Sequence, residues 1–140
     1  MEVDIKVFNP PYDKKEFYEH MGDVFSMNTV RKELPYLSND PHRLWFLAFS
    51  GNTLIGFCSL QEHKNVVKLL CDYVFPQYRG NGVYRQLVDV RTTYAERYNK
   101  PIEIICTGDI FSEMYLKRGF VEVKRTKNYR FLRRGVSNAT

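Results

Sequence analysis

The chain has little cysteine, no long apolar run and no basic, apolar leader at its start. Cys58, Cys71 and Cys106 are odd in number, far apart and set in apolar segments, which indicates reduced core residues and argues against a disulfide framework. No apolar run approaches the roughly 20 residues of a membrane span. The segment Met1–Asp4 lacks the features of a signal peptide. We therefore expect a cytoplasmic protein without membrane contact.

Metal-ligand patterns are missing as well. His20, His42 and His63 are spread along the chain, and neither they nor the cysteines show the spacing of a zinc site. We expect no metal.

What is present is the pattern of a single globular domain over residues 1–134, followed by a short tail over 135–140. With 44% hydrophobic and 15% aromatic residues, a chain of 140 residues can bury a core of ordinary size. Alternating and helical spacings of apolar residues predict an α+β chain. Strands are expected at 2–8, 44–49, 53–60 with a bulge at Gly56, 66–75, 102–107, 120–125 and 128–133, and helices within 13–37 (two), at 82–98 and at 110–118.

The most informative segment is the junction Gln77–Gly82, which joins a predicted strand to a predicted helix. Gly80 and Gly82 allow backbone dihedrals that a side chain forbids, and they let a ligand approach the backbone. The first amide groups of a helix have no partner within the helix, and the helix dipole adds partial positive charge there. The junction therefore predicts a site for a phosphate or pyrophosphate.

Two common phosphate-binding motifs are absent from this junction. Arg85 stands where the third glycine of the dinucleotide fingerprint belongs, and no Gly-Lys-Ser/Thr sequence occurs. The pattern Gln-x-x-Gly-x-Gly over residues 77–82 instead resembles the acyl-CoA pyrophosphate loop of the GNAT superfamily of N-acetyltransferases. The pattern Tyr-x-x-x-Gly-Phe over residues 115–120 is similar to the signature at the end of that family's last helix. Gly119 is therefore expected to be the left-handed glycine that follows this helix.

This resemblance covers residues 44–134 and implies the GNAT fold. That fold is a central mixed, mostly antiparallel sheet of six or seven strands with about four helices. Its fourth and fifth strands splay apart. The expected strands and helices of this chain follow that order.

The resemblance implies acetyl-CoA as a cosubstrate. The loop amides are expected to hold its pyrophosphate, with Arg79 adding charge, and the main chain near Tyr73 and Val74 is expected to meet the thioester carbonyl. Gly108 stands where the family often has an asparagine that touches the CoA arm, so Asp109 or nearby backbone groups are expected to serve instead. The expected contacts are Tyr73, Val74, Gln77, Tyr78, Arg79, Gly80, Asn81, Gly82, Val83, Tyr84, Asp109 and Tyr115.

Two side chains are candidates for proton transfer. By resemblance, Tyr115 protonates the departing CoA thiolate, because a phenol with a reference pKa near 10 is a proton donor at neutral pH. The alternative is an ordinary packed tyrosine. Asp72, a carboxylate in an apolar strand, is the candidate general base. An ion-paired role for Asp72, the weaker candidates Glu103 and Asp109, and a water chain to solvent stay open.

The acceptor is the least determined part of the reaction. We expect direct transfer to a primary amine of a small molecule or a protein, through a ternary complex that needs no acyl-enzyme on Cys71. The net charge of +5 and the arginines and lysines of the C-terminal third keep a nucleic-acid substrate open. A noncatalytic CoA-binding module and a homodimer also stay open. Acceptor contacts are expected from residues 22–43 and the last hairpin, with Met27, Tyr36, Trp45 and Tyr129 as candidates.

Overall fold

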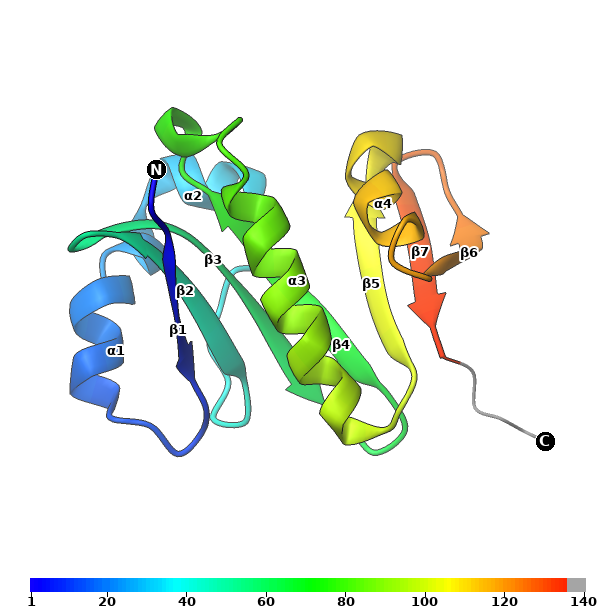
Figure 1. The fold of residues 1–140 in the computed structure, drawn as a ribbon, viewed down its shortest axis with the longest axis horizontal. Coiled ribbons are helices and arrows are strands. Elements are labelled where there is room, and N and C mark those ends of the chain that lie inside the picture. Colours follow the sequence, from blue (N-terminus) through cyan, green and yellow to red (C-terminus); the bar gives the residue numbers. More distant parts are fainter. Residues whose placement is uncertain (136–140) are drawn as a thin grey trace. The chain divides into compact units, whose positions relative to one another are not determined.

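The computed structural model describes residues 1–135 and has an α+β architecture with seven strands in one mixed sheet (Figure 1). The strand order is β1-β2-β3-β4-β5-β7-β6. The chain divides into two compact units. One contains residues 1–59 and 71–91, and the other contains residues 60–70 and the chain from Thr92 onward. The expected fold class is therefore confirmed.

The first unit contains the N-terminal strands and helices. Its elements are β1 (Asp4–Phe8), α1 (Lys14–Met21), the 3-10 helix η1 (Val24–Ser26), α2 (Asn28–Glu33), β2 (Leu44–Ser50), most of β3 (Thr53–Glu62), the end of β4 (Val67–Val74), the 3-10 helix η2 (Pro76–Tyr78) and most of α3 (Val83–Ala95). Helix α1 begins where the Asp13 carboxylate accepts hydrogen bonds from the amides of Lys15 and Glu16, at 2.9 and 3.3 Å. Such a cap satisfies amides that have no partner within the helix.

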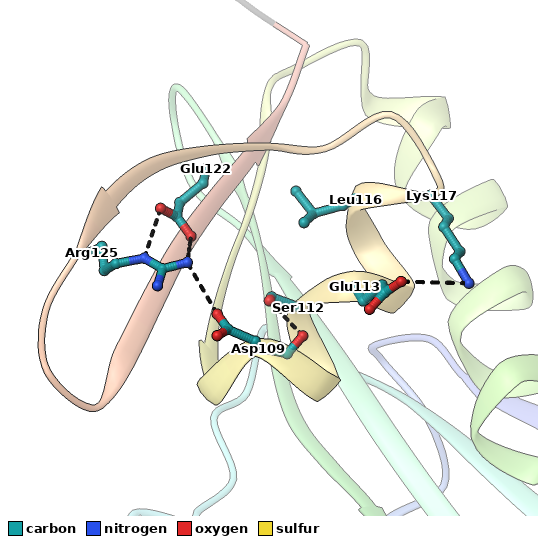
Figure 2. A pocket seen from close by; sticks show the side chains of 7 residues that line it. All are labelled: Asp109, Ser112, Glu113, Leu116, Lys117, Glu122 and Arg125. Atoms are coloured by element: carbon teal, nitrogen blue, oxygen red, sulfur yellow. Dashed lines mark hydrogen bonds and ion pairs between the residues drawn. The ribbon is translucent and has the colours of Figure 1, made fainter.

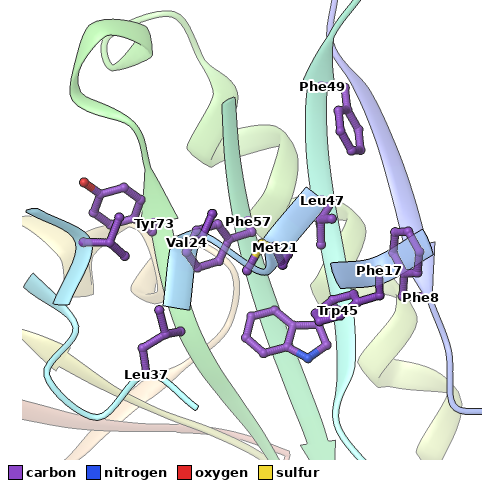
Figure 3. Close-up of a cluster of buried hydrophobic side chains, with 11 residues drawn as sticks. Phe8, Phe17, Met21, Val24, Leu37, Trp45, Leu47, Phe49, Phe57 and Tyr73 are labelled. Carbon is purple, nitrogen blue, oxygen red and sulfur yellow. The ribbon is translucent and has the colours of Figure 1, made fainter. Parts of the chain in front are cut away.

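The core of the first unit is aromatic (Figure 3). The fully buried Phe17 ring lies 5.5 Å from Phe8 and 5.6 Å from Trp45, between centroids. The indole Nε1–H of Trp45 donates to Asn39 Oδ1 at 2.8 Å, which supplies the partner that a buried indole requires. Trp45 is therefore a core residue, which corrects its expected place in an acceptor pocket.

Gly56 lies where β3 and β4 approach closely. A Cβ atom at Gly56 would lie 2.9 Å from the Tyr73 carbonyl oxygen, and within 3.4 Å of the side chains of Val74 and Leu87. The missing side chain therefore admits the backbone of β4, and the bulge expected at this glycine stays a prediction. In β4, the backbone of Cys71 adopts the left-handed conformation, with φ +58°.

The second unit contains the C-terminal strands and helix. Its elements are the end of β3, the start of β4, the end of α3, the 3-10 helix η3 (Glu96–Tyr98), β5 (Ile102–Thr107), α4 (Gly108–Leu116), β6 (Val121–Arg125) and β7 (Tyr129–Arg134). Strand β7 pairs antiparallel with both β5 and β6, and α4 packs against β5 and β7. The parallel pairing of β4 with β5 covers only Val67↔Ile102 and Lys68↔Glu103. The predicted splay thus corresponds to strand pairing between β4 and β5 that stops after these two residue pairs.

The predicted elements agree with the structure except at their ends. The strand expected at 102–107 is confirmed to the residue. The helix expected at 82–98 ends at Ala95 and continues as η3, and the region 13–37 contains η1 between its two helices. In the expected tail 135–140, residues 136–140 lie outside the described part of the chain. Within residues 1–135, no helix is long and apolar enough to cross a membrane.

The close approach at Gly56 makes a prediction about stability. Gly56→Ala should lower the free energy of unfolding by roughly 1–3 kcal/mol, because overpacking forces the strands apart. Thr53→Val exchanges a hydroxyl for a methyl group at an exposed position of the same strand and should change stability by less than about 0.5 kcal/mol. Urea unfolding curves measure both variants. Equal stability of Gly56→Ala and wild type would contradict the packing account.

Candidate functional site

The loop between β4 and α3 has the backbone that the sequence predicted. Gly80 and Gly82 adopt φ +82° and +79°, a region that side chains disfavour. The Gly82 carbonyl accepts the first helical hydrogen bond, from the Gln86 amide at 3.2 Å, so α3 begins at this glycine. Nothing lies within 4 Å of a Cβ built at either glycine. Both positions are therefore open to a ligand.

The N-terminus of α3 is suited to an anion. The first amides of this helix, those of residues 83–85, have no carbonyl one turn earlier in the helix to bind. The first turn of α3 contains no acidic residue, whereas α1 and α4 each have one there. The positive end of the helix dipole is therefore not offset by a carboxylate in its own first turn.

Side chains of the loop hold its shape. Asn81 Nδ2 donates to the carbonyl oxygens of Tyr78 and Arg79, at 3.2 and 3.3 Å. The Arg79 guanidinium donates from Nε to the Val74 carbonyl at 2.7 Å and from Nη2 to both carboxylate oxygens of Glu33, at 2.9 and 3.1 Å. Arg79 thus links the loop to the end of α2. Its expected contact with a phosphate stays a prediction.

Asp72 is held by two side chains of α3. Its carboxylate forms a two-point ion pair with Arg91, in which Nη1 meets Oδ1 and Nη2 meets Oδ2 at 2.9 Å. The Tyr84 hydroxyl donates to Asp72 Oδ2 at 2.5 Å. The Arg91 side chain is fully buried and that of Asp72 is 17% exposed. The ion-paired alternative considered from the sequence is therefore present, and a base role for Asp72 stays a prediction.

Tyr73 and Val74 lie at the end of β4, and both are buried. The Tyr73 ring stacks on Phe57 at 5.6 Å between centroids, with the Arg79 guanidinium 5.2 Å from its centroid on another side. Burial raises the pKa of the Tyr73 phenol. Packing therefore accounts for the side chain of Tyr73, and any contact with a cosubstrate would come from the backbone.

The backbone of Val74 points away from β3. The Phe75 amide donates to the Ile55 carbonyl at 3.0 Å, so the polar groups of Phe75 face β3. Successive residues of a strand direct their backbone groups to opposite edges. The N–H and C=O of Val74 therefore point to the other edge of β4, where the Val74 carbonyl accepts the hydrogen bond from Arg79. Within residues 1–135, β5 pairs with β4 only at Val67 and Lys68.

In the second unit, Tyr115 lies at the end of α4 and is fully buried. Gly119 has φ +88°, and the amides of Gly119 and Phe120 donate back to the carbonyls of Leu116 and Tyr115, at 3.4 and 3.1 Å. These two bonds form a Schellman motif, and the Tyr115 and Phe120 rings pack edge to face at 5.4 Å, as such a motif favours. The Tyr-x-x-x-Gly-Phe pattern is therefore the end of a helix, with Gly119 as predicted.

Asp109 is in the first turn of α4 and is exposed. Its carboxylate accepts from Arg130 Nε at 2.7 Å and from Arg125 Nη2 at 3.0 Å, and the hydrogen bond from Arg130 in particular lowers the pKa of Asp109. It lines a hollow of about 400 Å³ between α4 and β6, whose charged side chains pair with one another (Figure 2). A contact of Asp109 with CoA stays a prediction.

Most of the C-terminal arginines have acidic partners within the second unit. Arg125 pairs with Glu122 and Asp109, and Arg134 pairs with Glu96. The Arg133 and Arg130 guanidiniums meet Glu103 and Asp109, at 3.7 and 2.7 Å. The basic residues that are crowded in the sequence are therefore largely neutralised locally. Glu103, a weaker candidate for the general base, forms one of these pairs, with Arg133.

The structure thus brings some of the predicted site residues into direct contact, and others share an element. In the first unit, the Tyr84 hydroxyl connects the start of α3 to Asp72, next to Tyr73 and Val74. In the second unit, α4 carries both Asp109 and Tyr115. The sequence did not identify Arg91 or Glu33 as partners. One signal for Arg91 existed, because it follows the buried Leu87 by four residues and so lies on the apolar face of α3.

Across residues 1–135, no three His, Cys, Asp or Glu side chains are grouped so that they could hold a metal ion. The three cysteines are free, and burial raises the pKa of the Cys58 thiol to about 12 and also raises that of Cys71. Neither thiol is therefore primed as a thiolate.

Comparison with solved structures gives close agreement in fold. Escherichia coli ElaA has 14% sequence identity and a TM-score of 0.77, over 96% of this chain and 100% of that one. An acyl-CoA N-acyltransferase from Pseudomonas aeruginosa has 20% identity and a TM-score of 0.76 over the same shares. The PaiA N-acetyltransferase of Thermoplasma acidophilum, solved in complex with coenzyme A, has 16% identity and a TM-score of 0.65, over 97% and 100%.

No sequence among the curated proteins matches the chain. A model of the acetyltransferase (GNAT) domain, however, matches residues 8–134, which include the glycine loop, Asp72 and Tyr115. That match, with the mixed sheet and its short β4–β5 ladder, supports acyl transfer from an acyl-CoA. On this evidence the chain belongs to the GNAT acetyltransferase family.

Proposed function

We propose that this protein transfers an acetyl group from acetyl-CoA directly to a primary amine. The observation that carries the proposal is the N-terminus of α3. It combines an open glycine loop, the positive end of a helix dipole and a first turn without acidic residues. These features suit the pyrophosphate of an acyl-CoA, and they occur in a chain of the GNAT family. Residues 77–84 are assigned to this contact.

The thioester carbonyl is assigned to the Val74 amide. The N–H and C=O of Val74 point away from β3, to the other edge of β4. In the described chain, β5 pairs with that edge only at Val67 and Lys68. An amide fixed in a strand can donate to the oxyanion of the tetrahedral intermediate with no reorganisation during the reaction. This placement supports the main-chain role expected near Tyr73 and Val74.

The acyl group passes to the amine without an acyl-enzyme. A nucleophilic cysteine must be a thiolate, and burial raises the pKa of the Cys71 thiol. The amine nitrogen therefore attacks the thioester carbonyl while both substrates are bound. The nitrogen–carbon bond forms, the carbon–sulfur bond breaks, and the amine proton must leave.

We assign the proton for the departing CoA thiolate to Tyr115, and removal of the amine proton to water that leads to solvent. A phenol is protonated at neutral pH and can donate to a thiolate. Asp72 is less suited to be the base, because a carboxylate that accepts from a guanidinium and a hydroxyl is stabilised in its ionised form.

A nucleic-acid acceptor receives less support. Arg125, Arg130 and Arg134 are paired with carboxylates in the second unit, which reduces the positive potential available to a phosphate backbone. One similar structure is the NatC complex bound to Gag peptide and CoA, at 16% identity and a TM-score of 0.64. We favour an amine acceptor, either a small molecule or a protein amine.

The loop assignment makes a prediction about cosubstrate binding. Gly82→Val should abolish measurable binding of CoA in calorimetric titration, because the side chain would project into the space open to the pyrophosphate. Gly51→Val is the matched control. Gly51 also has a positive φ, of +60°, with nothing within 4 Å, so it reproduces the backbone strain in a different turn. Unchanged affinity of Gly82→Val would refute the loop assignment.

The role of Tyr115 makes a second prediction. Tyr115→Phe should lower turnover by about 10²-fold or more while leaving the affinity for acetyl-CoA nearly unchanged, because the variant lacks the proton donor. Release of the CoA thiol in the presence of a panel of amines and peptides measures turnover.

Tyr98→Phe controls for the loss of a phenol in the same unit. Thermal melts check that Tyr115→Phe is folded, and the ring that packs on Phe120 remains in this variant. Wild-type turnover in Tyr115→Phe would return this residue to a packing role.

A further inference from the structure

Asp72, Arg91 and Tyr84 form a network that joins β4 to α3 and β3. Arg91 and Tyr84 lie two turns apart on α3, and both meet the same carboxylate. Arg91 Nη1 also donates to the Ser59 carbonyl of β3, at 3.2 Å. The network therefore ties together three elements of the first unit around one fully buried guanidinium.

The network begins immediately after a strained residue. Cys71 has φ +58°, and for a residue with a Cβ this backbone costs on the order of 1–2 kcal/mol. Such a conformation persists only where surrounding contacts hold it. Asp72 is the next residue, and its carboxylate is bound to α3 at both oxygens. The ion pair thus fixes the direction in which the chain leaves Cys71.

The residues that follow are those assigned to the thioester. Tyr73 packs its carbonyl against the bare Cα of Gly56, and the Phe75 amide binds the Ile55 carbonyl. These contacts fix the end of β4 to β3, whereas Asp72 fixes it to α3. Because α3 begins with the amides assigned to the pyrophosphate, the Asp72–Arg91 pair sets the Val74 amide relative to those amides.

We propose that Asp72, Arg91 and Tyr84 are a positioning element that holds the thioester-binding backbone of β4 in register with the pyrophosphate-binding end of α3. This inference rests on the proposed acyl transfer. None of the three side chains needs to touch the reacting atoms. The network acts through the backbone at Cys71–Val74, so either member of the ion pair is expected to matter to the same extent.

The first test measures the backbone and does not depend on activity. Asp72→Asn should speed amide hydrogen exchange of residues 71–75 by about tenfold or more, as measured by NMR, because the strained segment loses its anchor. Asp89→Asn is the matched control, since it removes a carboxylate from the exposed face of the same helix. Exchange at 71–75 equal to that of the control would overturn the proposal, even if the protein proved not to be an enzyme.

The second test separates positioning from base catalysis. Asp72→Asn and Arg91→Met should each lower turnover by about 10-fold or more, with the affinity for CoA changed by less than about threefold, because misplacement affects the reaction and not pyrophosphate binding. Their effects should not add in the double variant, since both remove the same link. Tyr84→Phe should have a smaller effect in the same direction.

Folding of the variants is checked by thermal melts. If Asp72→Asn, which leaves the buried Arg91 charge without its partner, is unstable, the double variant removes that lone charge and takes its place in both tests. A base role predicts a different result. Turnover would then fall only in variants that lack the Asp72 carboxylate, with loss of the acidic limb of the pH profile. If the double variant keeps its acidic limb, positioning is supported; if that limb disappears, the proposal is wrong. If the wild-type protein does not bind acetyl-CoA, the proposed function is wrong. The positioning network would still be tested, because the exchange measurement does not depend on cosubstrate binding.

Discussion

The buried charge of Arg91 is the constraint on which the first unit depends. A guanidinium without solvent contact must be neutralised, and leaving such a charge without its partner costs about 3–5 kcal/mol. Asp72 supplies the partner from β4, so α3 and β4 cannot separate without breaking the pair. The glycine loop connects these two elements, and its ends are therefore fixed before any ligand binds. An anion at the start of α3 meets amides that are already in place.

The two motifs that indicated the family have different physical meanings. The glycines of the loop have positive φ and leave open space at the start of α3, where we propose that the cosubstrate binds. Gly119 and Phe120 end α4 through backbone hydrogen bonds and ring packing, which is a structural use. The Tyr115 ring packs against Phe120 at this helix end, while its hydroxyl is proposed to protonate the departing thiolate. One short pattern can therefore serve both the fold and the reaction.

Patterns that are local in sequence predicted much of the fold and part of the site. The strand–glycine loop–helix junction and the left-handed Gly119 follow from residue types and spacing alone, and both are present. The pairs Asp72–Arg91 and Glu33–Arg79 join residues 19 and 46 positions apart, so they depend on how elements pack and not on local spacing.

Three other features were also beyond local reasoning. A positive φ at Cys71 has no signal in a residue with a side chain. Trp45 was expected near an acceptor pocket, but its neighbours across the first unit bury it. The basic residues of the C-terminal third left an acidic partner open, and the carboxylates that pair with Arg125, Arg130, Arg133 and Arg134 come from α4, β5, β6 and η3. In each case the outcome was decided by tertiary contacts that a linear pattern does not contain.

The most direct test of the central claim is a calorimetric titration of the wild-type protein with acetyl-CoA, with CoA and ATP as comparison ligands. Our account predicts saturable one-to-one binding of acetyl-CoA and CoA in the micromolar range, with weaker binding of ATP, because the pyrophosphate and the pantetheine arm both contribute. Absence of acetyl-CoA binding by a folded sample would contradict it. The glycine loop before α3 would then be only a structural turn, and no acyl donor would have a place in this chain.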